Sequence, residues 1–157
     1  METEVIIFDY GRTLFDNELD RFFEESVMVV EACRARGYLL AIVSYVDLGK
    51  GDTPKKRLRR LRDAGLAQHF EICLFATDDP ANKDALYAQV IGELEVKPQR
   101  VAIVDDRVIR GIRWGNQHGC KTIWLQRGKF ASELPNEQTG LPTHRIGSLW
   151  DLLELLE

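Results

Sequence analysis

Two segments of the chain place aspartates where strands are expected to end. Asp9 directly follows the apolar, β-branched run Val5–Phe8, and Asp105-Asp106 follows the similar run 101–104. Such runs are typical of strands buried on both faces of a parallel sheet. If these two strands are neighbours, their carboxylates meet at one edge of the sheet and repel unless a cation lies between them. Carboxylate oxygens together with bound water suit Mg²⁺.

Two further side chains would suit an anion beside that metal. Ser44 follows another apolar run, residues 38–43, and Lys83 stands near the start of a helical pattern. A hydroxyl, a lysine and the backbone N–H groups at a helix N-terminus all bind anionic oxygens. A metal site next to an anion site indicates a phosphorylated ligand.

Strand and helix patterns alternate along the whole chain. Five strands are predicted at residues 5–8, 38–43, 72–75, 101–104 and 122–125. Helical patterns start at Asn17, at Thr53-Pro54, near Lys83, between the last two strands, and at Ser148. This alternation predicts an α/β fold with right-handed crossovers. Because the strands are apolar throughout, helices must cover both faces of the parallel sheet, which gives a three-layer sandwich whose ligands bind at the carboxyl ends of the strands.

Length, charge and cysteine content limit the class of protein. A chain of 157 residues fits one domain, expected over residues 1–157, and its net charge of −4 argues against general binding to nucleic acid or membrane surfaces. Its cysteines, Cys33, Cys73 and Cys120, form no C-x-x-C pair and are expected to be reduced, which favours the cytoplasm. The acidic N-terminus predicts no signal peptide, and no apolar run reaches the roughly 18 residues of a membrane span.

A cluster of cations stands out in this acidic chain. Residues 55–62 contain six of them: Lys55, Lys56, Arg57, Arg59, Arg60 and Arg62. On a helix, Leu58 and Leu61 would face the core while these cations face water, and a solvated surface is the simpler interpretation. The alternative is a groove for a polyanion such as a nucleic-acid end, although interleaved aromatic residues are missing.

Four of these segments, taken in order, resemble the motifs of the haloacid-dehalogenase-like superfamily. Residues 8–14 (FDYGRTL) resemble its first motif, and 41–44 (AIVS) its second. Lys83 matches the lysine of the third motif, and 103–106 (IVDD) the acid of the fourth. The segments 111–119 and 122–125 are similar to the helix and strand that follow. The resemblance implies a Rossmann-like sheet with strand order 3-2-1-4-5 and, given the short connections, no cap domain.

The resemblance also implies a mechanism. Asp9 would be the nucleophile of an aspartyl-phosphate intermediate, in a hydrolase of the phosphatase type. Magnesium would be held by the carboxylates of Asp9 and Asp106 and by the backbone carbonyl of Gly11. The phosphoryl oxygens would be bound by Ser44 and by Lys83, which also offsets charge that develops in the transition state.

Four further positions of the resembling motifs bear on the expected activity. Thr13 would hold the loop of the first motif near the phosphate. Gly11 stands where phosphatase members carry the aspartate that protonates the leaving group, and Gly111 stands where a second acid of the fourth motif supports the lysine or the metal's waters. Asp105 would partly replace that missing acid and add to the metal ligands.

Two functions follow from these departures. The first is a Mg²⁺-dependent phosphohydrolase or phosphotransferase that is slow or restricted to activated phosphates, because general acid–base catalysis is worth about 10²–10⁴-fold. The second is a catalytically degenerate domain that binds a phosphate ligand or a protein. The phosphorylated partner is of unknown class, and a second copy of the chain would be one way to close an uncapped site.

Overall fold

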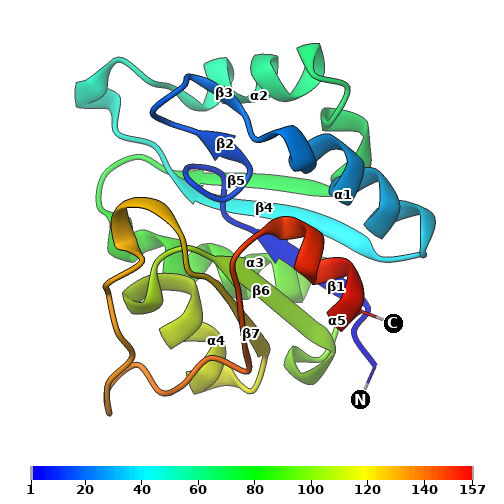
Figure 1. Ribbon diagram of the computed structural model, residues 1–157, viewed down its shortest axis with the longest axis vertical. Coiled ribbons are helices and arrows are strands. Elements are labelled where there is room, and N and C mark those ends of the chain that lie inside the picture. Colours follow the sequence, from blue (N-terminus) through cyan, green and yellow to red (C-terminus); the bar gives the residue numbers. More distant parts are fainter. Residues whose placement is uncertain (1, 157) are drawn as a thin grey trace.

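The computed structural model describes residues 2–156, and its main sheet has six parallel strands in the order β5-β4-β1-β6-β7-β8 (Figure 1). The strands are β1 (Val5–Phe8), β4 (Leu39–Tyr45), β5 (Ile72–Ala76), β6 (Val101–Asp105), β7 (Lys121–Leu125) and β8 (His144–Ile146). The first five confirm the predicted order 3-2-1-4-5. The sixth strand was not predicted, because His144 and Arg145 are exposed at the sheet edge and leave no apolar run.

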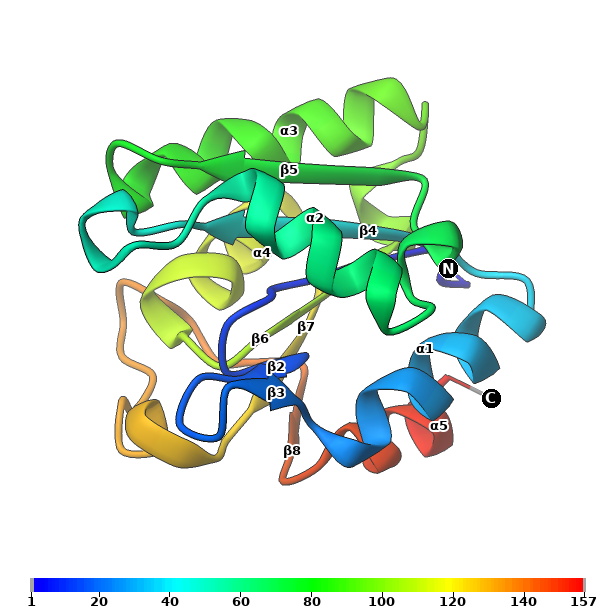
Figure 2. The ribbon, with the colours of Figure 1, turned by 90° about the horizontal axis from the view of Figure 1, so that it is seen from above.

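Helices cover both faces of this sheet, as predicted. They are α1 (Glu24–Ala35), α2 (Pro54–Asp63), α3 (Lys83–Glu93), α4 (Arg113–His118) and α5 (Leu152–Leu155). Side chains of α1, α2 and α5 pack with Ile6 and Phe8 of β1, whereas side chains of α3 and α4 pack with Val5 and Ile7 on the other face. Figure 2 shows α3 and the pair α1 and α5 on opposite sides of the sheet. The alternation of β1 side chains between two cores explains why this strand is apolar throughout.

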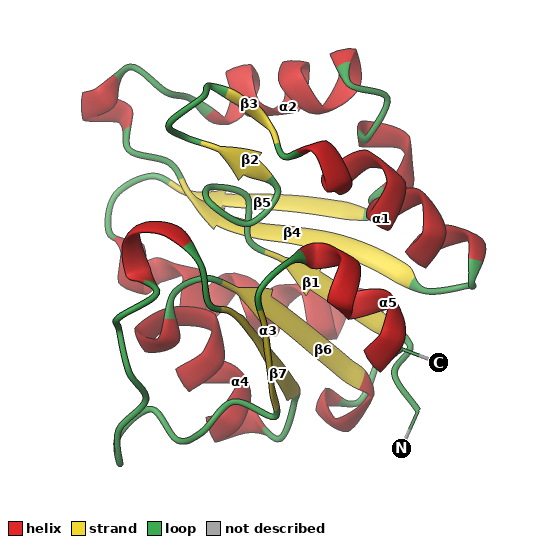
Figure 3. Cartoon of the chain, in the orientation of Figure 1, coloured by secondary structure: helices red, strands yellow, loops and turns green. Residues whose placement is uncertain are grey.

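The segment after β1 differs from the prediction of a helix from Asn17. It forms a small antiparallel hairpin, β2 (Phe15–Asp16) with β3 (Arg21–Phe22), drawn apart from the main sheet in Figure 3. The side chain of Asp16 accepts hydrogen bonds from two backbone N–H groups of the turn. The rings of Phe15 and Phe22 meet edge to face, 5.2 Å apart. These contacts outweigh the helical spacing of the apolar residues, and α1 begins only at Glu24.

The three cysteines form no disulfide within the described part of the chain. Cys33 and Cys120 are buried and Cys73 is half-buried. Burial raises the pKa of Cys33 and of Cys73 to about 11 and that of Cys120 to about 12, so the thiols are protonated near neutral pH. Across residues 2–156, every helix is too short or too polar to cross a bilayer.

Candidate active site

Three carboxylates converge at the carboxyl ends of β1 and β6. The two strands pair in parallel register, with Phe8 opposite Val104, and this register brings Asp9 level with Asp105. Asp9, Asp105 and Asp106 are all buried, and one carboxylate oxygen of each lies within 4.8 Å of the others. The predicted meeting of Asp9 with the acidic pair is therefore confirmed. Such a cluster is costly unless cations neutralise it.

One lysine faces two of these carboxylates. Lys83 is the first residue of α3, is 3% exposed, and places its Nζ 3.5 Å from Asp9 Oδ1 and 3.3 Å from Asp105 Oδ2. Burial alone would lower the pKa of Lys83, but the Asp105 and Asp9 carboxylates outweigh it and raise that pKa well above its ordinary value. The lysine is therefore charged, and it pairs with two of the three acids, Asp9 and Asp105.

Asp105 is the best satisfied of the three. Its Oδ1 accepts the N–H of Arg107 at 3.0 Å, and its Oδ2 accepts the N–H of Gly111 at 2.9 Å in addition to Lys83. Burial alone would raise the pKa of Asp105, but Lys83 and these N–H groups lower it. With both oxygens engaged, the geometry favours a role in holding Lys83. The prediction that Asp105 also binds the metal stays a prediction.

Asp106, unlike Asp105, has a carboxylate oxygen that accepts no hydrogen bond from the described residues. Its Oδ2 is buried without a hydrogen-bond partner among residues 2–156. Burial, with the nearby Asp105 and Asp9 carboxylates, raises the pKa of Asp106 to about 10. Burial likewise raises the pKa of Asp9, against the lowering effect of Lys83. The Trp124 indole donates to the backbone carbonyl of Asp106 at 3.0 Å and fixes this residue in place.

The donor set fits a magnesium ion. Asp106 has a carboxylate oxygen that finds no partner within residues 2–156, and Asp9 stands beside it with a carboxylate that Lys83 only partly neutralises. Both are hard oxygen ligands, which Mg²⁺ prefers, and the pocket beside them leaves room for the waters that this ion retains. Gly11, whose backbone carbonyl is the third predicted ligand, lines the same pocket.

Ser44 lies near the end of β4 and is held by an arginine that sequence reasoning placed on the solvent face. Arg57 of α2 donates from Nη1 to Ser44 Oγ at 2.7 Å and from Nε to Asp52 Oδ2 at 2.9 Å. Its guanidinium lies 4.5 Å from the centroid of the Tyr10 ring, and the residue is only 7% exposed. Because the hydroxyl accepts from Arg57, its own hydrogen is free to point at a ligand oxygen.

The basic helix is thus rotated relative to the prediction. Arg57 and Leu61 face inward one turn apart, while Leu58, expected in the core, is 43% exposed. Residues four apart share a helix face, so the spacing of Arg57 to Leu61 was a signal that could have revealed the inward arginine. Arg60 also lines the pocket, and Lys55, Lys56, Arg59 and Arg62 remain exposed.

Thr13 does not perform the predicted role through its side chain in this structure. Its hydroxyl is buried and has no hydrogen-bond partner within the described residues, and it does not line the pocket. The loop is held by the backbone instead, because the N–H groups of Thr13, Leu14 and Phe15 all donate to the carbonyl of Tyr10. Its predicted contact with phosphate stays a prediction.

The two glycines that depart from the family motifs have different surroundings. A Cβ built at Gly11 would meet only the side chain of Asn17, at 3.3 Å, so this position has room for a larger residue. A Cβ at Gly111 would lie 2.6 Å from Asp105 Oδ2 and 2.8 Å from the Tyr87 hydroxyl. Packing therefore requires a glycine at position 111 but not at position 11.

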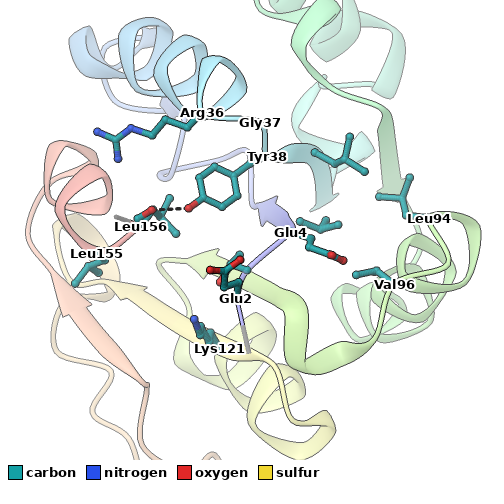
Figure 4. A pocket seen from close by; sticks show the side chains of 13 residues that line it. Glu2, Glu4, Arg36, Gly37, Tyr38, Leu94, Val96, Lys121, Leu155 and Leu156 are labelled. Carbon is teal, nitrogen blue, oxygen red and sulfur yellow. Dashed lines mark hydrogen bonds between the residues drawn. The ribbon is translucent and has the colours of Figure 1, made fainter.

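Asp9 and Asp106, together with Ser44 and Lys83, line one cavity of about 580 Å³. A larger cavity of about 870 Å³ lies at the opposite, amino end of the strands (Figure 4). There the Tyr38 hydroxyl donates to the carbonyl of Leu156, and Leu94 and Val96 form an apolar side. The described residues show no cluster of metal-binding groups at that end. The chemistry therefore belongs to the carboxyl ends of the strands, as is usual for such sheets.

The fold and this constellation define a phosphatase-type α/β domain with an aspartate after its first strand. A family model for haloacid dehalogenase-like hydrolases matches residues 2–119, and the chain belongs to this family. It is 25% identical over 129 residues to phosphoserine phosphatase of Thermus thermophilus, covering 81% of this chain and 48% of that protein. It is 26% identical over 126 residues to glyceraldehyde 3-phosphate phosphatase of Pyrococcus furiosus, covering 79% and 50%. The chain thus spans about half the length of these curated relatives.

Solved structures show the same fold. The HAD-hydrolase YfnB of Bacillus subtilis, in a structure bound to magnesium, superposes with a TM-score of 0.78 at 14% identity, covering 100% of both chains. The L-2-haloacid dehalogenase RSc1362 gives a TM-score of 0.76 at 15% identity, covering 99% of each. At such low identity these likenesses concern the fold alone.

Proposed function

We propose that this chain is a Mg²⁺-dependent phosphohydrolase or phosphotransferase that acts through an aspartyl-phosphate on Asp9. The observation that carries the proposal is the buried Asp106 Oδ2, which lacks a partner among the described residues and lies in one cluster with Asp9. Lys83 and the Ser44–Arg57 pair line the same cavity and supply positive charge and a hydroxyl for a phosphoryl group. Two relatives are phosphatases by name, which supports a phosphate monoester as substrate.

In the proposed reaction each site residue has a defined role. A carboxylate oxygen of Asp9 attacks phosphorus while the bond from phosphorus to the leaving oxygen breaks and its electron pair leaves with that oxygen. Water or an acceptor hydroxyl next attacks the phosphorus of the aspartyl-phosphate and frees Asp9. Ser44 and Lys83 bind the phosphoryl oxygens, and magnesium held by Asp9, Asp106 and the Gly11 carbonyl would offset their charge.

Gly11 determines which substrates are suitable. It carries no proton for the leaving oxygen, so the leaving group must depart as a stable anion or take its proton from water. Acyl and aryl phosphates meet this condition, and alkyl phosphates do not. The same observation favours the second candidate function, a degenerate domain that binds a phosphate ligand or a protein without turnover.

Turnover measurements separate the two. Hydrolysis of acetyl phosphate and p-nitrophenyl phosphate would be followed with and without Mg²⁺. Activity that requires the ion and disappears in Asp9→Asn supports the enzyme. A folded protein with no turnover of either compound would leave the binding function. Closure of the site by a second copy of the chain and contact of the exposed cations of α2 with a polyanion stay predictions.

A further inference from the structure

Three cations surround the ring of Phe130 on one wall of the active-site cavity. Arg107 Cζ lies 3.8 Å from the ring centroid, and Arg12 Cζ and Lys129 Nζ lie 5.4 Å from it. Phe130 ends a short turn after β7, and all four residues line the cavity that contains Asp9 and Asp106. The ring face attracts each cation, but three like charges around one ring also repel one another.

These charges are only partly neutralised by the chain itself. Arg107 pairs with Glu133 at 3.0 Å, whereas Arg12, Arg110 and Lys129 form no ion pair with a carboxylate inside the described range. Arg110 also lines the cavity, and its buried Nε has no hydrogen-bond partner among those residues. A half-buried arginine that lacks a partner is costly, and a bound anion would remove that cost.

The backbone at Arg12 is strained. Its φ of 59° lies in the left-handed region, which is unfavourable for a residue with a Cβ. Strain of this kind persists where the surrounding structure enforces it, and it is concentrated at functional sites. Here the hydrogen bond from the Arg12 N–H to the Phe15 carbonyl, 2.8 Å, holds the turn, and the side chain lines the cavity.

The local charge is opposite to that of the whole molecule. Eight cationic side chains line this cavity against five carboxylates, although the chain has a net charge of −4. Asp9 and Asp106 with their metal account for the reacting phosphoryl group and its charge. The cations around Phe130 are additional to Lys83 and Arg57, which line the same cavity and are assigned to that group by the proposed function.

We infer that the cavity wall formed by Arg12, Arg107, Arg110, Lys129 and Phe130 is a subsite for a second anionic group of a small substrate. The substrate class is therefore an acyl or aryl phosphate that also carries a carboxylate or a second phosphate on the same short skeleton. This inference rests on the proposed function, because it takes the reacting phosphate to lie at Asp9. The subsite cations belong to the loops after β1, β6 and β7 and not to the exposed face of α2, which favours a small ligand over a polynucleotide.

A matched pair of ligands tests it. Glycerol 3-phosphate and 3-phosphoglycerate each have three carbons and one phosphate, and only the second has a carboxylate. Their binding would be measured by calorimetry in Mg²⁺ at low salt, using full-length Asp9→Asn, which keeps an oxygen ligand but cannot form an aspartyl-phosphate. We expect 3-phosphoglycerate to bind about tenfold more tightly, since hydrogen bonds to charged groups contribute on this scale.

Removal of single cations should abolish that preference. Arg110→Gln and Lys129→Gln, each in the same background, are expected to bring the ratio of the two affinities near one. Lys129 is exposed, so its variant will fold even if loss of Arg110 disturbs the loop. Lys55→Gln, which removes an exposed cation of α2 outside the cavity, is the control and should keep the full ratio.

Three outcomes would overturn the inference. The first is equal affinity of Asp9→Asn for the two ligands. The second is an affinity ratio that stays near tenfold in both Arg110→Gln and Lys129→Gln. The third is tighter binding of a 5′-phosphorylated oligonucleotide than of 3-phosphoglycerate. Turnover of p-nitrophenyl phosphate by the wild-type chain tests the proposed function separately. Absence of turnover together with an intact binding ratio would reject the enzyme and keep the subsite.

Discussion

The carboxylate of Asp105 occupies the space beside the backbone of Gly111, whose N–H donates to Asp105 Oδ2 at 2.9 Å. The same oxygen lies 3.3 Å from Lys83 Nζ. From the sequence, the extra acid at the strand end was expected to replace in part the acid that is missing from the following helix. In the structure the two changes compensate each other. Asp105 contacts Lys83 from the space that a side chain at position 111 would otherwise occupy.

The close packing at Gly111 predicts a large effect of one methyl group. In Gly111→Ala the new Cβ would lie 2.6 Å from Asp105 Oδ2 and 2.9 Å from Ile103 Cγ2. We expect a loss of about 1–3 kcal/mol in the free energy of unfolding, the usual range for overpacking. Urea denaturation would measure it. Gly92→Ala in α3, where the Cβ meets nothing within 4 Å, is the control and should stabilise the chain by up to about 1 kcal/mol. Equal effects of the two substitutions would contradict this account.

If Asp105 and Gly111 form one unit, exchanging them should be tolerated better than changing either one. Gly111→Asp alone adds a carboxylate against Asp105, and Asp105→Gly alone leaves Lys83 without its closer partner. The double variant removes the clash with the Asp105 carboxylate and restores an acid near the lysine, while the close contacts of the new Cβ with Tyr87 and Ile103 remain. We expect a coupling free energy above about 1 kcal/mol in a double-mutant cycle of unfolding free energies. Additive effects would show that the two positions are independent.

Gly11 offers a direct test of the missing proton donor. Gly11→Asp is expected to raise turnover of an alkyl phosphate such as glycerol 3-phosphate by about 10²-fold, since this is the lower range for general acid–base catalysis. Only the exposed side chain of Asn17 must shift to admit it. The control is Gly11→Asn, which has similar size and no proton to transfer and should give no gain. A folded Gly11→Asp protein with an unchanged or lower rate would count against the acid–base explanation.

Arg57 is expected to position Ser44 for the phosphoryl group. Arg57→Lys keeps the charge but loses the two-armed contact with Ser44 and Asp52, and we expect it to weaken binding of inorganic phosphate by about tenfold. Competition against p-nitrophenyl phosphate, or calorimetry if turnover is absent, would measure this. Arg59→Lys, on the exposed face of the same helix, should leave phosphate affinity unchanged. An unaltered affinity in folded Arg57→Lys would remove the arginine from the site.

If Asp106 binds the metal, its replacement should raise the free energy of unfolding without Mg²⁺ and remove the stabilisation by Mg²⁺. In Mg²⁺-free buffer near neutral pH, Asp106→Asn should stabilise the chain by at least about 1 kcal/mol, because Asp106, whose pKa is raised to about 10, must take up a proton on folding and an amide need not. Mg²⁺ at a hundred times its dissociation constant should add about 2.7 kcal/mol to the free energy of unfolding of the wild type and so raise its unfolding temperature, and the variant should lose this rise. The exposed Asp78 supplies the control, Asp78→Asn, which should keep that rise. Identical Mg²⁺ responses in the three proteins would argue against this site.

The sequence by itself determined the frame of the site. Apolar runs and the polar residues that follow them are local features, and parallel strands bring their carboxyl ends to one edge, so the convergence of Asp9 with Asp106 could be predicted from spacing. The start of α3 at Lys83 belonged to the same pattern. Strand order for five strands followed from the resemblance and from the crossover rule.

Tertiary packing decided the rest. The rotation of α2 about its own axis places Arg57 against Ser44 and Tyr10. The spacing of Arg57 to Leu61 was compatible with that rotation, but Leu58 with Leu61 offered an equally good inward face, and only packing decided between them. The hairpin at β2 and β3 depends on contacts among the rings of Tyr10, Phe15 and Phe22, which only the folded chain brings together. Spacing shows which residues can reach an edge of the sheet. Which of them meet there depends on how side chains from distant segments fill the same space.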